Sequence, residues 1–126
     1  MTVRNLFIVN AIVSIIFGVV LVVIPAQALQ QYGVELPAAG VYVAQLVGSS
    51  LIGYAIITWL LRNEGDGLVR QTVLLALFVG YVIAFVASLI SQLNGLANGL
   101  GWTTVVIDLL FALASAYFRF IKTGTA

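Results

Sequence analysis

Hydrophobic residues fill four long stretches of the chain, and three more polar connections separate them. The stretches cover about residues 5–24, 37–61, 68–93 and 102–120. Each has roughly 19 to 26 residues, enough to cross a hydrocarbon core about 30 Å thick at 1.5 Å per helical residue. The pattern predicts an all-α protein with four membrane-spanning helices, in a single membrane domain covering residues 1–126.

The connections carry turn signals. "RNEGDGLVR" and "NGLANGLG" contain the Gly and Asn-Gly residues that favour tight turns. The first connection, "PAQALQQYGVELP", is longer, and we expect a short interfacial helix over residues 26–32 with Gly33 as its C-cap. Short connections place successive helices antiparallel, so the four spans predict an up-down-up-down bundle.

The basic residues predict the orientation. All five lie beside the same ends of the predicted helices: Arg4, Arg62, Arg70, Arg119 and Lys122. Because cytoplasmic loops are enriched in Lys and Arg, we expect both termini and "RNEGDGLVR" in the cytoplasm of a bacterial cell, with the protein in its inner membrane. A cleaved signal ending at Ala28 is the alternative, but its apolar stretch of about 19 residues exceeds the usual 7 to 15.

Composition narrows the function classes. The chain is 63% hydrophobic and 7% charged, with neither His nor Cys. A soluble domain carries about a quarter charged residues, so this chain needs a membrane. A net charge of +1 offers no basic surface for nucleic acid. Without thiol, imidazole or a nucleotide-binding motif, we expect no metal, no cofactor and no enzyme activity.

Small and polar residues form one stripe on each predicted span. Such residues mark contacts between membrane helices, and residues three or four apart share a face. The stripes are Asn10, Ser14 and Gly18; Gln45, Ser49 and Gly53 with Gly48 and Ser50 beside them; Gly80, Ala84, Ser88 and Gln92; and Thr104, Asp108, Ala112, Ser115 and Arg119. We expect them to face inward, with contacts to other chains as the alternative. The predicted packing residues are Ser14, Gly18, Gly48, Ser49, Gly53, Gly80, Ala84 and Ala112.

Asp108 is the candidate functional residue. It lies six residues after Trp102, about 9 Å inside the membrane boundary. Gln45 and Ser88 lie near the same depth, so we predict a polar cluster of these three side chains. An acid within a membrane is a functional candidate by default. Three roles stay open for Asp108: structural hydrogen bonding, handling of a proton or cation, and contact with a partner or lipid headgroup.

Three segments carry a family resemblance: "FGVVLVVIPAQALQQYGV", "AQLVGSSLIGYAIITWLLRN" and "DLLFALASAYF". Together they resemble a widespread group of small bacterial four-span membrane proteins without a characterised function. The matching features are Pro25, the Tyr32-Gly33 turn, Gly48, Gly53, Trp59 and Arg62. The resemblance implies the fold and a membrane location, and it supplies no active site.

Two functions remain. The first is a small non-catalytic membrane protein that acts as an accessory subunit or binds lipid or another membrane protein. The second is a small oligomeric transporter or channel in which Asp108 binds a proton or cation. Both imply contact with the bilayer, and either self-association or other membrane subunits as partners.

Overall fold

A computed structural model describes residues 1–121, and it is all-α. The elements in chain order are α1 (Val3–Val23), α2 (Pro25–Gln31), α3 (Ala38–Leu60), α4 (Leu68–Leu93), α5 (Gly101–Ala116) and the π-helical turn η1 (Tyr117–Ile121). The four long helices match the four predicted spans to within a few residues, and α5 with η1 forms the last of them. Lys122, one of the five predicted orientation signals, lies outside the described residues.

Local signals fix the ends of α1 and α2. The Thr2 hydroxyl accepts a hydrogen bond from the Asn5 backbone N–H (3.2 Å) and so caps α1. Pro25 begins α2, where its missing N–H costs nothing. Gly33 has a φ of 75°, and the Val34 N–H beyond it bonds to the Leu29 carbonyl. This is the Schellman arrangement, and it confirms the predicted short helix and its glycine cap.

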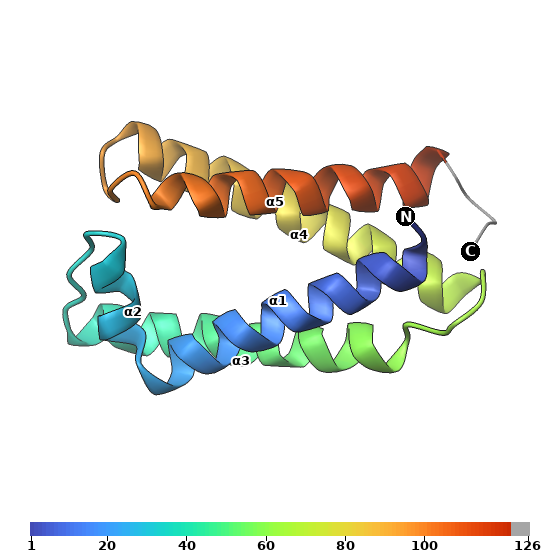
Figure 1. The fold of residues 1–126 in the computed structure, drawn as a ribbon, viewed down its shortest axis with the longest axis horizontal. Helices are drawn as coiled ribbons and strands as arrows, with labels where there is room; N and C mark the ends of the chain where they lie inside the picture. The colour runs from blue at the N-terminus through green and yellow to red at the C-terminus, as the bar shows by residue number, and fades with distance from the viewer. Residues whose placement is uncertain (122–126) are drawn as a thin grey trace.

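The long helices form two antiparallel pairs (Figure 1). We call α1 with α3 the first pair, and α4 with α5 the second pair. The first pair is tight because two glycines meet: a Cβ added to Gly48 would lie 2.7 Å from the Gly18 carbonyl oxygen, and one added to Gly18 would lie 2.8 Å from the Gly48 oxygen. No side chain larger than hydrogen fits there without moving a helix.

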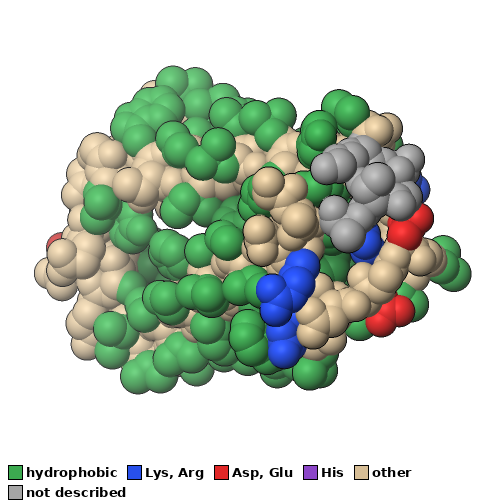
Figure 2. All heavy atoms as spheres, turned by 45° about the vertical axis from the view of Figure 1, so that its right-hand side comes forward, with side chains coloured by type: hydrophobic (Ala, Val, Ile, Leu, Met, Phe, Trp, Pro, Cys, Tyr) green, Lys and Arg blue, Asp and Glu red, His purple; other side chains and the backbone are tan. Residues whose placement is uncertain are grey.

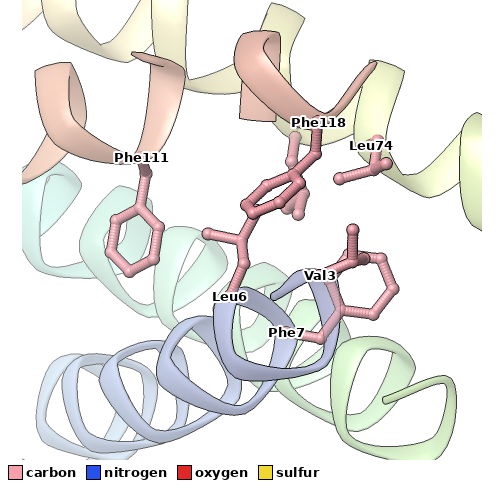
Figure 3. Close-up of a cluster of buried hydrophobic side chains, with 7 residues drawn as sticks. Val3, Leu6, Phe7, Leu74, Phe111 and Phe118 are labelled. Atoms are coloured by element: carbon pink, nitrogen blue, oxygen red, sulfur yellow. The ribbon is translucent and has the colours of Figure 1, made fainter. Parts of the chain in front are cut away.

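A hydrophobic cluster joins the two pairs at one end of the molecule. Figure 3 shows side chains from three helices pointing toward one another. The buried members are Val3, Leu6 and Phe7 of α1, Leu74 and Leu77 of α4, Phe111 of α5 and Phe118 of η1. We call this end the basic end, because Arg4, Arg62, Arg70 and Arg119 lie beside the helix termini there.

At the other end, which we call the distal end, the pairs are joined through Asn98. Its backbone N–H donates to the Tyr32 carbonyl (2.7 Å), and its side-chain amide donates to the Gln31 carbonyl (3.0 Å). The α4–α5 turn is thereby tied to the end of α2. Asn98 is itself held, because its carbonyl accepts from the Gln92 side chain (2.9 Å) and its side-chain oxygen from the Leu100 N–H (3.0 Å).

The outside of the bundle is apolar. Large hydrophobic side chains such as Ile83, Leu110 and Leu113 are exposed along the helices. Most of the charged side chains in view gather at the basic end (Figure 2). All four long helices have the length and hydropathy of membrane spans. An exterior of this kind is stable in lipid rather than in water.

Candidate functional site

Asp108 lies on α5 and faces α4. Its side chain is 8% exposed, and one carboxylate oxygen accepts a hydrogen bond from the Ser88 hydroxyl (3.2 Å). The structure therefore brings together two of the three residues in the predicted cluster. The Ser88 hydroxyl also lies 3.1 Å from the Phe85 carbonyl, one turn earlier in α4. Because one hydroxyl donates one proton, Ser88 divides it between these two acceptors.

Gln45, the third predicted member, lies elsewhere. Its side chain is exposed and donates to the Val22 carbonyl (3.2 Å) near the end of α1. The last carbonyls of a helix lack partners within that helix, so Gln45 caps α1 instead of reaching Asp108. At about 100° per residue, Gln45 points roughly 140° away from Thr58, a fully buried residue of α3. The placement of Gln45 in the cluster was wrong for this reason.

A second polar group, not predicted, links the two helix pairs in the middle of the bundle. The Tyr81 hydroxyl of α4 donates to the Asn10 side-chain oxygen of α1 (2.5 Å). The Asn10 amide lies 3.3 Å from the Thr58 hydroxyl of α3, which itself donates to the Tyr54 carbonyl (2.8 Å). Asn10 belonged to a predicted inward stripe. A tyrosine far from either membrane boundary was the overlooked signal.

Two buried serines have no hydrogen bond of good geometry within the described part of the chain. Ser14 is 1% exposed, lies one turn after Asn10 on α1 and neighbours the Tyr81 hydroxyl. Ser115 is fully buried on α5, two turns beyond Asp108. Tyr81 and Ser14 lie beside each other between the two pairs.

The predicted packing residues divide into two groups. Ser14, Gly18, Gly48 and Ala112 are buried, and Ala84 is half-buried. Three others were misplaced: Ser49, Gly53 and Gly80. Ser49 is exposed and its hydroxyl bonds to the Leu46 carbonyl of its own helix (2.8 Å), while a Cβ added to Gly53 or Gly80 would meet nothing within 4 Å.

A hollow lies between the two pairs near the distal end. Figure 2 shows an opening there, bordered mainly by hydrophobic side chains. The first pair contributes an apolar cavity of about 500 Å³. Its lining includes Leu21 of α1, Leu29 of α2, Leu36 of the connection, and Gly40 and Val47 of α3. We call this cavity and the opening above it the hollow.

Helical phase places the cavity lining on the side that faces the second pair. Gly40 and Val47 precede Thr58 by 18 and 11 residues. They therefore share its direction to within about 20° at 100° per residue. Leu21 follows Ser14 by two turns and shares its direction in the same way. Ser88 follows Tyr81 of α4 by two turns and so shares its direction toward the first pair, and Asp108 of α5 lies beside it through their hydrogen bond.

These features define a multi-pass membrane protein built from two antiparallel helix pairs. The chain belongs to the DUF8292 family, a domain of unknown function whose profile matches residues 3–124. No curated protein and no solved structure matches the chain. The resemblance to small four-span membrane proteins is confirmed in two respects: the match to a family of unknown function, and the four apolar helices of membrane-span length. A bacterial inner membrane stays a prediction.

Proposed function

We propose that the protein is a non-catalytic membrane protein that binds a lipid, or another amphipathic molecule of the bilayer, in the hollow between its helix pairs. The observation that carries the proposal is the pairing itself. The pairs meet through the hydrophobic cluster at the basic end and through Asn98 at the distal end. Between these two contacts the pairs leave the opening of Figure 2, and the first pair with α2 lines an apolar cavity of the size that ligand sites have.

The lining supports a ligand from the bilayer over one from water. The cavity is lined by Leu, Val, Ala and Gly residues, whose side chains offer no hydrogen bonds to a water-soluble molecule. The opening in Figure 2 lies on the side of the bundle, where lipid would surround it. A hydrocarbon chain entering from the side would replace empty space with dispersion contacts.

Native mass spectrometry of the protein purified in mild detergent tests the proposal. We expect one or a few lipid molecules to remain bound to each chain. Val47→Phe should reduce this retention at least fivefold, because the ring fills the hollow. Val86→Phe is the matched control, since Val86 and Val47 are both 48% exposed but Val86 does not line the cavity. Equal retention by the two variants would overturn the proposal, and a constant foreign subunit would favour an accessory role.

A second candidate function is ion transport through Asp108. The observation in its favour is two hydrogen-bonded polar groups inside the bundle: Ser88 with Asp108, and Tyr81 with Asn10 and Thr58. Against it stands the hydrophobic cluster, which fills the basic end of the space between the pairs. Proton and cation flux into liposomes, compared between the protein and Asp108→Asn, tests this alternative. Flux that depends on Asp108 would favour transport over simple binding.

A further inference from the structure

Asp108 has more hydrogen-bond acceptor capacity than the described residues use. An ionised carboxylate offers about four lone-pair sites. Among residues 1–121 it receives one side-chain hydrogen bond, and Ser88, the donor, shares its proton with the Phe85 carbonyl. Buried carboxylates are normally paired with a cation or fully hydrogen-bonded, because an unpaired buried charge is costly.

No basic residue of the described chain lies near enough to neutralise Asp108. Arg4, Arg62, Arg70 and Arg119 all belong to the basic end. Arg70 precedes Ser88 by 18 residues on the same helix, about 27 Å along the axis. Arg119 follows Asp108 by 11 residues, about 16 Å. Within the described residues Asp108 therefore has no cationic partner, so its carboxyl is neutralised either by a proton or by a cation bound from outside.

An independent feature points to a ligand at the same place. Ser14 is 1% exposed, and its hydroxyl has the Tyr81 hydroxyl as its polar neighbour but no hydrogen bond of good geometry among the described residues. Ser14 shares a helix face with Leu21 of the cavity wall, and Tyr81 shares a helix face with Ser88, the donor to Asp108. Buried polar groups without partners are rare in folded proteins. A donor group bound between the pairs would satisfy Ser14 and Asp108 together.

Resting on the proposed function, we infer that the ligand of the hollow is an apolar molecule carrying an amine, whose ammonium group binds the Asp108 carboxylate. The ammonium provides both the missing charge and up to three hydrogen-bond donors, which match Asp108 and the Ser14 oxygen. Its hydrocarbon part lies against Leu21, Leu29 and Val47. A neutral lipid would fill the hollow equally well but would supply no charge to Asp108, which would then have to be neutralised by a proton.

Binding of radiolabelled decylamine to the full-length protein in nanodiscs of a zwitterionic lipid tests the inference, with empty nanodiscs subtracted. We expect saturable binding of about one molecule per chain, weakened at least tenfold in Asp108→Asn. Asp66→Asn is the matched control, because Asp66 bonds to Gln71 near the basic end and should not alter the affinity. Unlabelled decanol, which has the same chain but no charge, should compete at least tenfold less effectively than decylamine.

Further variants keep the test decisive if Asp108→Asn does not fold. Val47→Phe leaves the carboxylate intact and should weaken decylamine binding at least tenfold, whereas Val86→Phe should not. Wild-type affinity in folded Asp108→Asn or in Val47→Phe, or equal competition by decanol, overturns the inference. If Val47→Phe still loses bound lipid in that case, the proposed function stands and only the amine is wrong. If Val47→Phe retains both lipid and decylamine, both proposals fail.

Discussion

Gly48 and Gly18 let α1 and α3 approach until the backbone of one helix contacts the other. An added methyl at Gly48 would lie 2.7 Å from a carbonyl oxygen, which cannot rotate away as a side chain can. We expect Gly48→Ala to lower the free energy of unfolding by about 1–3 kcal/mol, the usual range for overpacking. Titration of the folded protein with a denaturing detergent, followed by circular dichroism, measures this change.

The control for this prediction is Gly53→Ala on the same helix, where an added Cβ meets nothing within 4 Å. Alanine favours a helix over glycine by up to about 1 kcal/mol, so Gly53→Ala should leave stability unchanged or raise it. A loss at Gly53 as large as that at Gly48 would contradict the close contact between the glycines.

The Tyr81–Asn10 hydrogen bond is the polar contact that joins the two pairs in mid-bundle. Tyr81→Phe, Asn10→Ala and the double variant form a cycle that isolates its free energy. We expect a coupling of about 0.5–2 kcal/mol, the range that hydrogen bonds between membrane helices show. Unfolding in a denaturing detergent provides the four stabilities. If the losses of stability in the two single variants simply add in the double variant, the hydrogen bond does not stabilise the contact between the pairs.

Single residues were predictable where polarity and position agreed. Asp108 and Ser88 stood out as a carboxylate and a hydroxyl at matching depths, and they are bonded. Tyr81 did not stand out, because tyrosine is common at membrane boundaries. Only its position far from both boundaries separates it from the other tyrosines. Gln45 was misplaced because its side-chain amide caps a carbonyl at the end of α1. The sequence of α3 alone does not show that this carbonyl needs a hydrogen-bond donor.

At the scale of the elements, Asn98 is the contact that holds the distal ends together. We expect Asn98→Ala to loosen the α4–α5 turn from α2, because the side-chain bond to the Gln31 carbonyl and the brace to Leu100 are lost and only the backbone bond to Tyr32 remains. Spin labels at Gln30 and Leu96, both exposed, would report a longer and broader distance distribution by pulsed electron resonance. Asn94→Ala removes the same amide from the preceding turn and should leave the distribution unchanged. Identical distributions in both variants would exclude a fastening role for Asn98.

The helices themselves were the most predictable part of the fold. The long apolar runs indicated the extent of the spanning helices. Pro25 marked the start of α2, and Gly33 marked its end. The inward face of α3 was not predictable, because that helix is apolar almost all round and small residues occur on several of its sides. Gly48 is buried while Gly53 is open, and the partner surface decides between them.

For the whole molecule, the orientation in the membrane is the first quantity to measure. With the basic end in the cytoplasm, an impermeant thiol reagent added to intact cells should label cysteines placed at Gln30 and Leu96. A cysteine at Gly65, in the connection at the basic end, should react only after the cells are opened. The reverse labelling pattern would place the basic end outside the cytoplasm. The chain has no cysteine of its own to interfere.

The pairing of the helices also divides the chain in sequence. The first pair is made wholly from residues before Arg62, and the second wholly from residues after Gly67. The close helix–helix contacts of each half therefore form within that half, and they do not require the other half. We expect residues 1–64 and 65–126, expressed as separate fragments in one cell, to insert independently and reassemble. Co-purification through a tag on one fragment would measure this reassembly. Phe7→Ala should reduce the amount of the second fragment recovered, because it removes a ring from the hydrophobic cluster that joins the halves. During synthesis, the first half would already be a finished hairpin while the ribosome was still making the second.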